Sequence, residues 1–230
     1  MFADRTPATA EPPVLDLRLG GLSLGGVPVL GRMDLTVAPR ETLAVVGPSG
    51  IGKSTLLRIF AGLEARFDGS CRIDGRVAIV FQEPALLPWR SLLDNIIVAT
   101  GVSADMARAA LEEVGLGARW QSFPNRLSLG QQRRVALARA FAVPPDLLLL
   151  DEPFVSLDPA LSEEMMALFQ KLRERHRMAT ILVTHVQAEA DRLADRVITL
   201  GGAPARIMSE DQKSGAYFHS SASGVTASGS

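Results

Sequence analysis

One short stretch, residues 47–55, constrains the fold of this chain more than any other. It reads Gly-Pro-Ser-Gly-Ile-Gly-Lys-Ser-Thr, the apolar run 43–46 before it is typical of a buried strand, and residues 53–62 have helical spacing. Its glycines allow a backbone path that side chains would block, so that successive N–H groups can turn toward one anion. A glycine-rich loop between a strand and a helix predicts a phosphate-binding loop.

The side chains of this loop define its chemistry. Lys53 would reach the terminal phosphates of a nucleotide, and the Ser54 hydroxyl would ligate the Mg²⁺ that bridges them. The alternative, a glycine-rich turn with a chance Lys-Ser pair, is disfavoured by the complete pattern between strand and helix. The predicted phosphate-binding residues are Gly47, Pro48, Ser49, Gly50, Gly52, Lys53, Ser54 and Thr55.

Composition excludes several classes of protein. The formal net charge of −1 and the isoelectric point near 6.3 give no general attraction to nucleic acid. The single cysteine, Cys71, excludes an internal disulfide and indicates a reducing compartment. The first residues lack the apolar core of a secretory signal, and no apolar stretch approaches the ~18 residues of a membrane-spanning helix. We therefore expect a cytoplasmic protein that reaches a membrane only by docking onto another protein.

The order of predicted elements indicates an α/β fold with a mixed sheet, built on a phosphate-loop nucleotide-hydrolase core. Alternating apolar residues at 14–19 and 33–37 predict an antiparallel N-terminal β subdomain, and four leucines at 147–150 are typical of a strand buried on both faces of a parallel sheet. Further strands are predicted at 71–74, 77–81, 181–184 and 197–200, and helices at 105–114, 130–142, 159–177 and 186–193.

These elements form one domain, which we expect to span residues 14–213. The pattern of short helices after the strand at 77–81 predicts an inserted helical subdomain at about residues 88–142. Residues 1–13 and 214–230 are expected to be a disordered lead and a disordered tail.

Polar residues follow three of the predicted strands, at the sheet edge where open α/β sheets bind ligands. Asp151 and Glu152 end the four-leucine strand, and they could divide the work: Asp151 would hold Mg²⁺ and Glu152 would polarise the attacking water. His185 and Gln82 follow the strands at 181–184 and 77–81 and could contact the γ-phosphate and the metal or water. Considered alone, each of these residues could equally be a polar residue at the end of a strand with no function.

Two helix starts have both a structural and a functional interpretation. Ser128 with Gln131 three residues later forms a capping box, and Asp158 followed by Pro159 is an ordinary helix start. The functional interpretation is that Ser128 and its helix end bind a second phosphate group. Because residues 47–55 already bind phosphate, this second set would serve the nucleotide of another subunit.

Taken in order, residues 47–55, Gln82, 127–131, 147–153, 156–158 and His185 resemble the nucleotide-binding subunit of ABC transporters over residues 14–208. The resemblance implies the ABC ATPase fold, ATP and Mg²⁺ as cofactors, and ATP hydrolysis by a head-to-tail dimer that sandwiches two ATP molecules. It makes Glu152 the catalytic base, His185 the γ-phosphate contact, and Gln82 a γ-phosphate sensor and metal ligand. Ser128, Gly130, Gln131 and Asp158 would act across the dimer interface.

A finer resemblance lies in residues 81–90, Phe-Gln-Glu-Pro-Ala-Leu-Leu-Pro-Trp-Arg, and in residues 151–154, Asp-Glu-Pro-Phe. Both are similar to importer ATPases of the nitrate, sulfonate and taurine type. This implies a membrane permease docked near residues 82–90, a peripheral position on the cytoplasmic face of the inner membrane, and indirect work with a substrate-binding protein. Trp89 could equally be a local core residue.

Three residues depart from the family pattern. Leu24 stands where an aromatic residue usually stacks on adenine, and Leu129 replaces the first glycine of the usual signature. Arg40 stands where a glycine is usual, and we expect Pro39 and Arg40 to form a type I turn.

Two other classes share part of this set of motifs. A DNA-repair or chromosome-associated ATPase needs a long coiled-coil insertion and usually a basic surface, and the sequence has neither. A small-molecule kinase with a phosphate loop would not need residues 128–131 or His185.

Overall fold

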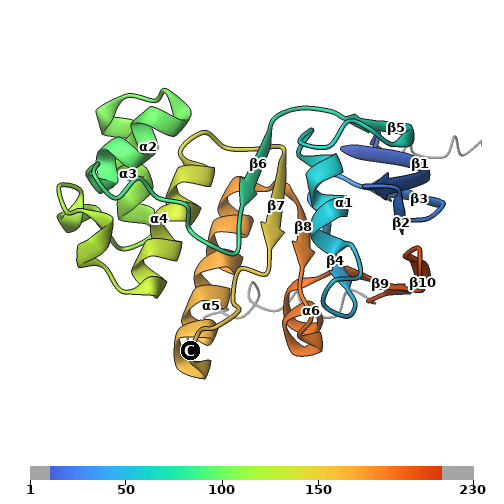
Figure 1. The fold of residues 1–230 in the computed structure, drawn as a ribbon. Coiled ribbons are helices and arrows are strands. Elements are labelled where there is room, and N and C mark those ends of the chain that lie inside the picture. The colour runs from blue at the N-terminus through green and yellow to red at the C-terminus, as the bar shows by residue number, and fades with distance from the viewer. Residues whose placement is uncertain (1–10, 214–230) are drawn as a thin grey trace, which may run out of the picture.

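Two sheets form the framework of the protein in the computed structural model, which describes residues 11–213. The larger sheet has six strands in the order β10-β9-β4-β8-β7-β6 (Figure 1). Its pairs are parallel except that β10 runs antiparallel to β9, so the predicted mixed sheet is confirmed. The strands are β4 (Thr42–Val46), β6 (Val77–Val80), β7 (Leu147–Asp151), β8 (Ala179–Val183), β9 (Arg196–Gly201) and β10 (Arg206–Gln212).

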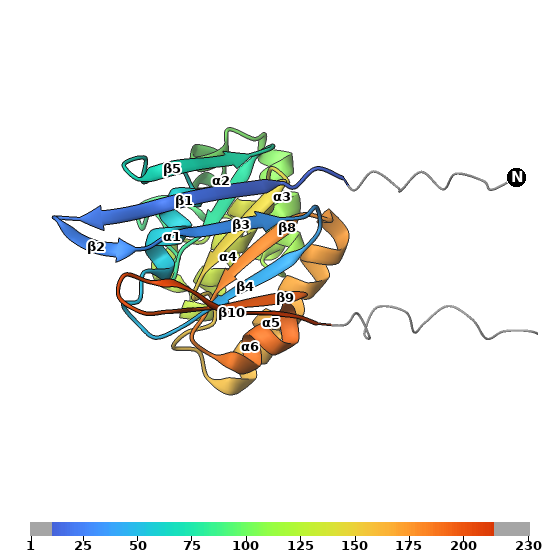
Figure 2. The same cartoon turned by 90° about the vertical axis from the view of Figure 1, so that its right-hand side faces the viewer.

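The smaller sheet is the antiparallel N-terminal layer, which faces the viewer in Figure 2. Its central strand, β1, pairs antiparallel with the other three, which confirms the predicted direction of the N-terminal strands. Alternate leucines of β1 are buried against α1, which the two sheets enclose in one core. The elements are β1 (Leu15–Leu24), β2 (Val27–Leu30), β3 (Met33–Val37), β5 (Asp68–Ile73) and α1 (Lys53–Phe60).

Helices cover the face of the large sheet opposite α1 and extend beyond its edge strand, β6. The segment between β6 and β7 carries α2 (Leu92–Thr100), α3 (Ala104–Glu113), η1 (Gly117–Arg119), η2 (Pro124–Arg126) and α4 (Leu129–Phe141), the green group in Figure 1. A second apolar core joins these helices to β7 and to α5 (Pro159–His176). A small third cluster packs α6 (Gln187–Leu193) against β4 and β9. No helix within residues 11–213 is long and apolar enough to cross a membrane.

The structure shifts the bounds of several predicted elements, corrects the type of one turn and adds two strands. Strand β6 ends at Val80, one residue before the predicted end. The predicted type I turn is wrong, because Arg40, its third residue, has a φ of 65°, which belongs to a type II turn. Strands β2 and β10 were not predicted, since β2 has four residues including a proline and β10 is largely exposed. Residues 1–10 and 214–230, where disorder is expected, lie outside the described part.

Candidate active site

The phosphate loop, residues 47–52, joins the buried end of β4 to the start of α1. Gly47 lies so close to β9 that a Cβ there would stand 2.7 Å from the carbonyl oxygen of Leu200. Gly52 caps the helix with a φ of 109°, in the left-handed region that favours glycine. Glycine is therefore required here by backbone contact and by backbone conformation, as the sequence pattern predicted.

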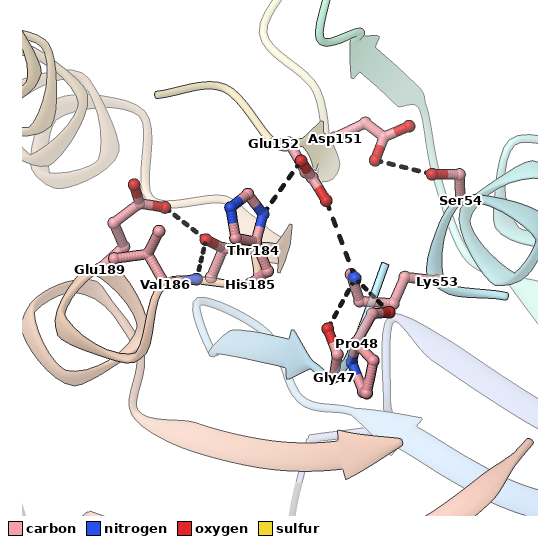
Figure 3. A network of polar contacts seen from close by, with 10 residues as sticks. All are labelled: Gly47, Pro48, Lys53, Ser54, Asp151, Glu152, Thr184, His185, Val186 and Glu189. Atoms are coloured by element: carbon pink, nitrogen blue, oxygen red, sulfur yellow. Dashed lines mark hydrogen bonds and ion pairs between the residues drawn. The ribbon is translucent and has the colours of Figure 1, made fainter. Parts of the chain in front are cut away.

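Lys53 lies at the base of this loop with only 4% of its surface exposed. Its Nζ donates hydrogen bonds to the carbonyl oxygens of Gly47, at 2.8 Å, and Pro48, at 3.0 Å. The same atom is 3.7 Å from Oε1 of Glu152, the residue that follows β7 (Figure 3). The ammonium group thus joins the phosphate loop to the carboxylate of the neighbouring strand end.

Ser54 and Asp151 place two oxygen atoms side by side. The Ser54 hydroxyl donates to Oδ1 of Asp151 at 3.1 Å. Burial raises the pKa of Asp151 and the charge of Glu152 adds to this, while the Ser54 hydrogen bond and the charge of Lys53 oppose it. A hydroxyl and a carboxylate fit Mg²⁺, which takes few protein ligands and completes its shell with phosphate and water oxygens. Residues 11–213 hold no group of three or more His, Cys, Asp or Glu side chains that could form an all-protein metal site.

Glu152 and His185 form a pair that the sequence did not reveal. Nδ1 of His185 lies 3.2 Å from Oε2 of Glu152, so the carboxylate contacts Lys53 through one oxygen and His185 through the other (Figure 3). Glu152 has a φ of 46°, and its backbone N–H donates to Val183 of β8 at 2.9 Å. A non-glycine residue in this region is strained, and such strain gathers at functional sites.

Thr184 and Glu189 adjoin this pair and were not among the predicted site residues. The buried Thr184 hydroxyl donates to Oε2 of Glu189 and accepts from the backbone N–H of Val186 at 3.0 Å. Burial raises the pKa of Glu189. In the sequence Glu189 reads as an ordinary acidic residue near a helix start, and only the fold reveals that it is buried.

Gln82 lies two residues beyond β6, whose last residue, Val80, pairs with Leu150 of β7. This register brings Gln82 to the sheet edge that carries Asp151 and Glu152. Its side chain is exposed and makes no hydrogen bond with another described residue. The structure therefore places Gln82 at the edge of the site without fixing its amide group by a hydrogen bond.

The segment after Gln82, residues 83–90, is held in place by hydrogen bonds from two side chains of the helical region. The buried Asn95 accepts a hydrogen bond from the backbone N–H of Leu87 at 2.6 Å and donates to backbone oxygens of Leu87 and Arg90. Arg139 of α4 donates to the carbonyl oxygens of Pro84 and Ala85, each at 3.0 Å. Trp89 is 69% exposed, so it is not a local core residue.

The second predicted phosphate-binding set lies on α4. The capping box is confirmed, because Ser128 accepts from the backbone N–H of Gln131 and Gln131 accepts from that of Ser128. Gly130 is buried, and a Cβ there would lie 2.6 Å from Leu161 of α5. Asp158 caps α5 by accepting from the backbone N–H of Leu161 at 3.0 Å.

The two predicted phosphate-binding sets do not meet within one chain. In Figure 1, α1 and α4 stand on opposite sides of β6 and β7. The structure brings together Lys53, Ser54, Asp151, Glu152 and His185, whereas Ser128, Gly130 and Gln131 lie at the start of α4 and Asp158 at the start of α5.

Comparison with known proteins gives three kinds of match. The family model described as ABC transporter matches residues 30–155. The aliphatic sulfonates import ATP-binding protein SsuB 2 of Burkholderia cenocepacia is 44% identical over 219 residues, covering 90% of this chain and 81% of the relative. The protein of the same name from Frankia alni is 49% identical over 180 residues, covering 77% and 73%.

Two solved structures share the fold. A dimeric ATP-binding cassette in a post-hydrolysis state, bound to ADP and Pi, has a TM-score of 0.74 and 28% identity, covering 86% of this chain and 98% of the other. An inward-facing metal-chelate type ABC transporter has a TM-score of 0.77 at 24% identity, covering 85% and 83%, and shows the likeness of the fold alone. The fold class predicted from the sequence is thereby confirmed.

Proposed function

The chain belongs to the ABC transporter family, and on this premise we propose that it is the ATP-binding and hydrolysing subunit of an importer. The observation that carries the assignment of the site is the Glu152 carboxylate, which lies at the end of β7 between Lys53 and His185. The names of the relatives support import, and none of the relatives or structures reported above favours a DNA-associated role.

The phosphates of ATP would be bound by the N–H groups of residues 47–52, by the N-terminal end of α1 and by Lys53. Lys53 would exchange its present carbonyl partners, Gly47 and Pro48, for phosphate oxygens. Ser54 and Asp151 would hold Mg²⁺, which when bound neutralises charge on the phosphates.

Hydrolysis would depend on Glu152 as the base that orients and polarises the attacking water. Its contacts with Lys53 and His185 fix the carboxylate at the sheet edge beside the phosphate loop. Because His185 faces Glu152 with Nδ1, its Nε2 atom is left to contact the γ-phosphate. Gln82, at the same sheet edge, would reach the metal or the water through its amide oxygen.

A second copy of the chain would complete each site. Within one chain, α4 and α1, the helix that follows the phosphate loop, lie on opposite sides of the large sheet, so the exposed Ser128 at the start of α4 would serve the nucleotide of the second copy. The dimeric state of the cassette bound to ADP and Pi supports this arrangement. Ser128, Gly130 and Gln131 would then contact the partner's nucleotide, and Asp158 would link the two sites.

The permease would dock against residues 82–90, which would hold the protein at the cytoplasmic face of the inner membrane. Support comes from the exposed indole of Trp89 on a segment that Asn95 and Arg139 hold in place. An exposed aromatic side chain on a fixed backbone is typical of an interface anchor. The solute is a small molecule of the kind carried for the relatives, an aliphatic sulfonate or a similar compound, delivered by a substrate-binding protein that this chain meets only indirectly.

Glu152→Gln tests the shared site. The variant should bind ATP with Mg²⁺ and accumulate as a dimer in gel filtration, because binding survives while water activation fails. Glu174→Gln, an exposed carboxylate on α5, is the matched control and should hydrolyse ATP normally. A Glu152→Gln variant that stays monomeric with ATP and Mg²⁺ contradicts the shared site.

The importer role is tested with a candidate permease reconstituted in vesicles. The permease should stimulate ATP hydrolysis by the wild-type chain. For Trp89→Ala, the fold stimulation, which is the rate with permease divided by the rate of the same variant without it, should be lower. Transfer of phosphate from ATP to a small acceptor would instead identify a kinase.

A further inference from the structure

We propose that Thr184 and Glu189 are positioning residues that hold His185 against Glu152, an inference that rests on the proposed function because it gives His185 a role at the γ-phosphate. Neither residue touches Lys53, Ser54 or Asp151 (Figure 3). They act through the backbone on either side of His185.

The Thr184 hydroxyl fixes the turn in which His185 lies. Thr184 follows β8 with 1% of its surface exposed. Its hydroxyl accepts from the N–H of Val186 at 3.0 Å and donates to Oε2 of Glu189 (Figure 3). The backbone N–H of Thr184 donates to Val45 of β4 at 3.2 Å. The hydroxyl of the residue before His185 therefore holds the backbone of the residue after it, while the backbone N–H of Thr184 is bonded to the central sheet.

Glu189 gives this hydroxyl a fixed acceptor. It lies in the first turn of α6 with 7% of its surface exposed, and burying a carboxyl group is costly unless it is hydrogen-bonded. Its nearest helical neighbour, Ala190, packs against Ala44 and Val46 of β4, the strand that leads into the phosphate loop. The imidazole of His185 is thereby placed relative to the loop as well as to Glu152.

An alternative is that Thr184 and Glu189 only stabilise the fold. The two roles differ in one respect: a structural defect lowers the amount of active protein, whereas a misplaced His185 lowers the turnover of protein that still binds ATP normally. The chain supplies a matched control in Thr180 of the same strand. Its hydroxyl is also buried, but it has no hydrogen-bond partner among the described residues.

The experiment compares Thr184→Val, Thr184→Ser and Thr180→Val in the full chain, with ATP hydrolysis measured as kcat and KM. We expect Thr184→Val to lower kcat at least about tenfold with KM for ATP within twofold of wild type. Thr184→Ser, which keeps the hydroxyl, and Thr180→Val should both keep kcat within twofold. A kcat for Thr184→Val within twofold of wild type, or an equal loss in Thr180→Val, would overturn the inference.

A double-mutant cycle tests whether the effect passes through His185. In a His185→Ala background, Thr184→Val should cause no further fall in kcat, and a further fall equal to that in wild type would contradict the inference. Should Thr184→Val fail to fold, Glu189→Gln and Glu189→Met replace it: Gln keeps an acceptor and should retain most of kcat, whereas Met should lose it. Equal kcat in these two variants would also overturn the inference.

Failure of this inference is distinct from failure of the proposed function. If the wild-type chain hydrolyses no ATP, the proposed function fails. If it does, and His185→Ala lowers kcat while Thr184→Val does not, only the positioning role fails.

Discussion

Replacing Arg40 with glycine should stabilise the protein, because the backbone there already adopts a glycine-like conformation. Arg40 is the third residue of the turn between β3 and β4, which is closed by a hydrogen bond from the Glu41 N–H to the Ala38 carbonyl at 3.2 Å. Its φ is 65°, and its exposed side chain makes no hydrogen bond or ion pair with any described residue. The side chain therefore contributes strain and no compensating contact.

The size of the effect follows from two opposing quantities. A residue with a Cβ costs about 1–2 kcal/mol in the left-handed region. A new glycine costs roughly 0.5–1 kcal/mol in additional conformational entropy of the unfolded chain. The difference predicts that Arg40→Gly raises the free energy of unfolding by about 0.5–1 kcal/mol, and the melting temperature by about 1–4 °C for a chain of this length.

Urea and thermal unfolding, followed by circular dichroism without nucleotide, measure this change. Arg40→Ala is the matched control, because it removes the same side chain and keeps the Cβ, and it should stay within about 0.5 kcal/mol of wild type. If Arg40→Gly is no more stable than Arg40→Ala, the strain argument for this turn is refuted.

Three further predictions concern a thiol, a buried carboxyl group and the nucleotide base. Burial, aided by the charge of Asp16, raises the pKa of Cys71 from 9.0 to about 11, so about one thiol in a thousand is ionised at pH 8. Ellman's reagent should thus react with the native chain at least about 100-fold more slowly than with the chain in urea, and equal rates would contradict the burial of this thiol. Burial raises the pKa of Glu189, so the folded state binds the proton of this carboxyl group more tightly than the unfolded state does. The contribution of this group to the free energy of unfolding should therefore be highest below pH 4.5 and fall as the pH rises above it. Urea unfolding of Glu189→Gln should therefore show a less steep fall in stability above pH 4.5, and identical slopes would count against this assignment. Leu24 lies 44% exposed at the end of β1, so Leu24→Tyr should offer a ring for stacking on adenine and strengthen ATP binding about fivefold by calorimetry, a gain of about 1 kcal/mol; unchanged affinity would exclude this hairpin from the base site.

The sequence predicted those parts of the fold and site that depend on local rules. The phosphate loop was evident because Gly47 and Gly52 stand where the backbone permits nothing larger. The shared position of Asp151, Glu152 and His185 followed from a topological rule, since the carboxyl ends of parallel strands meet at one sheet edge.

Two features, the backbone conformation of Arg40 and the burial of Glu189, depend on contacts between residues that are far apart in the sequence. The positive φ of Arg40 could not be foreseen, because Pro-Arg is compatible with a type I turn and only the pairing of β3 and β4 with their partners sets the chain direction. Likewise, Glu189 follows Thr184 by five residues in an unremarkable helix start, and its burial depends on α6 packing against β4.

Helix α4 links the two halves of the proposed site within one chain. The start of the helix is capped by Ser128, the residue expected to meet the partner's nucleotide. Farther along, Arg133 donates to the carbonyl oxygen of Pro153, directly after Glu152, and Arg139 donates to the carbonyls of residues 84 and 85, directly after the segment with Gln82. Hydrogen bonds from charged donors contribute about 1.5–3 kcal/mol each. A displacement of α4 must therefore either carry the segments after Glu152 and Gln82 with it or break these bonds, so under the proposed function binding at one nucleotide would be mechanically connected to the residues that would hydrolyse the other.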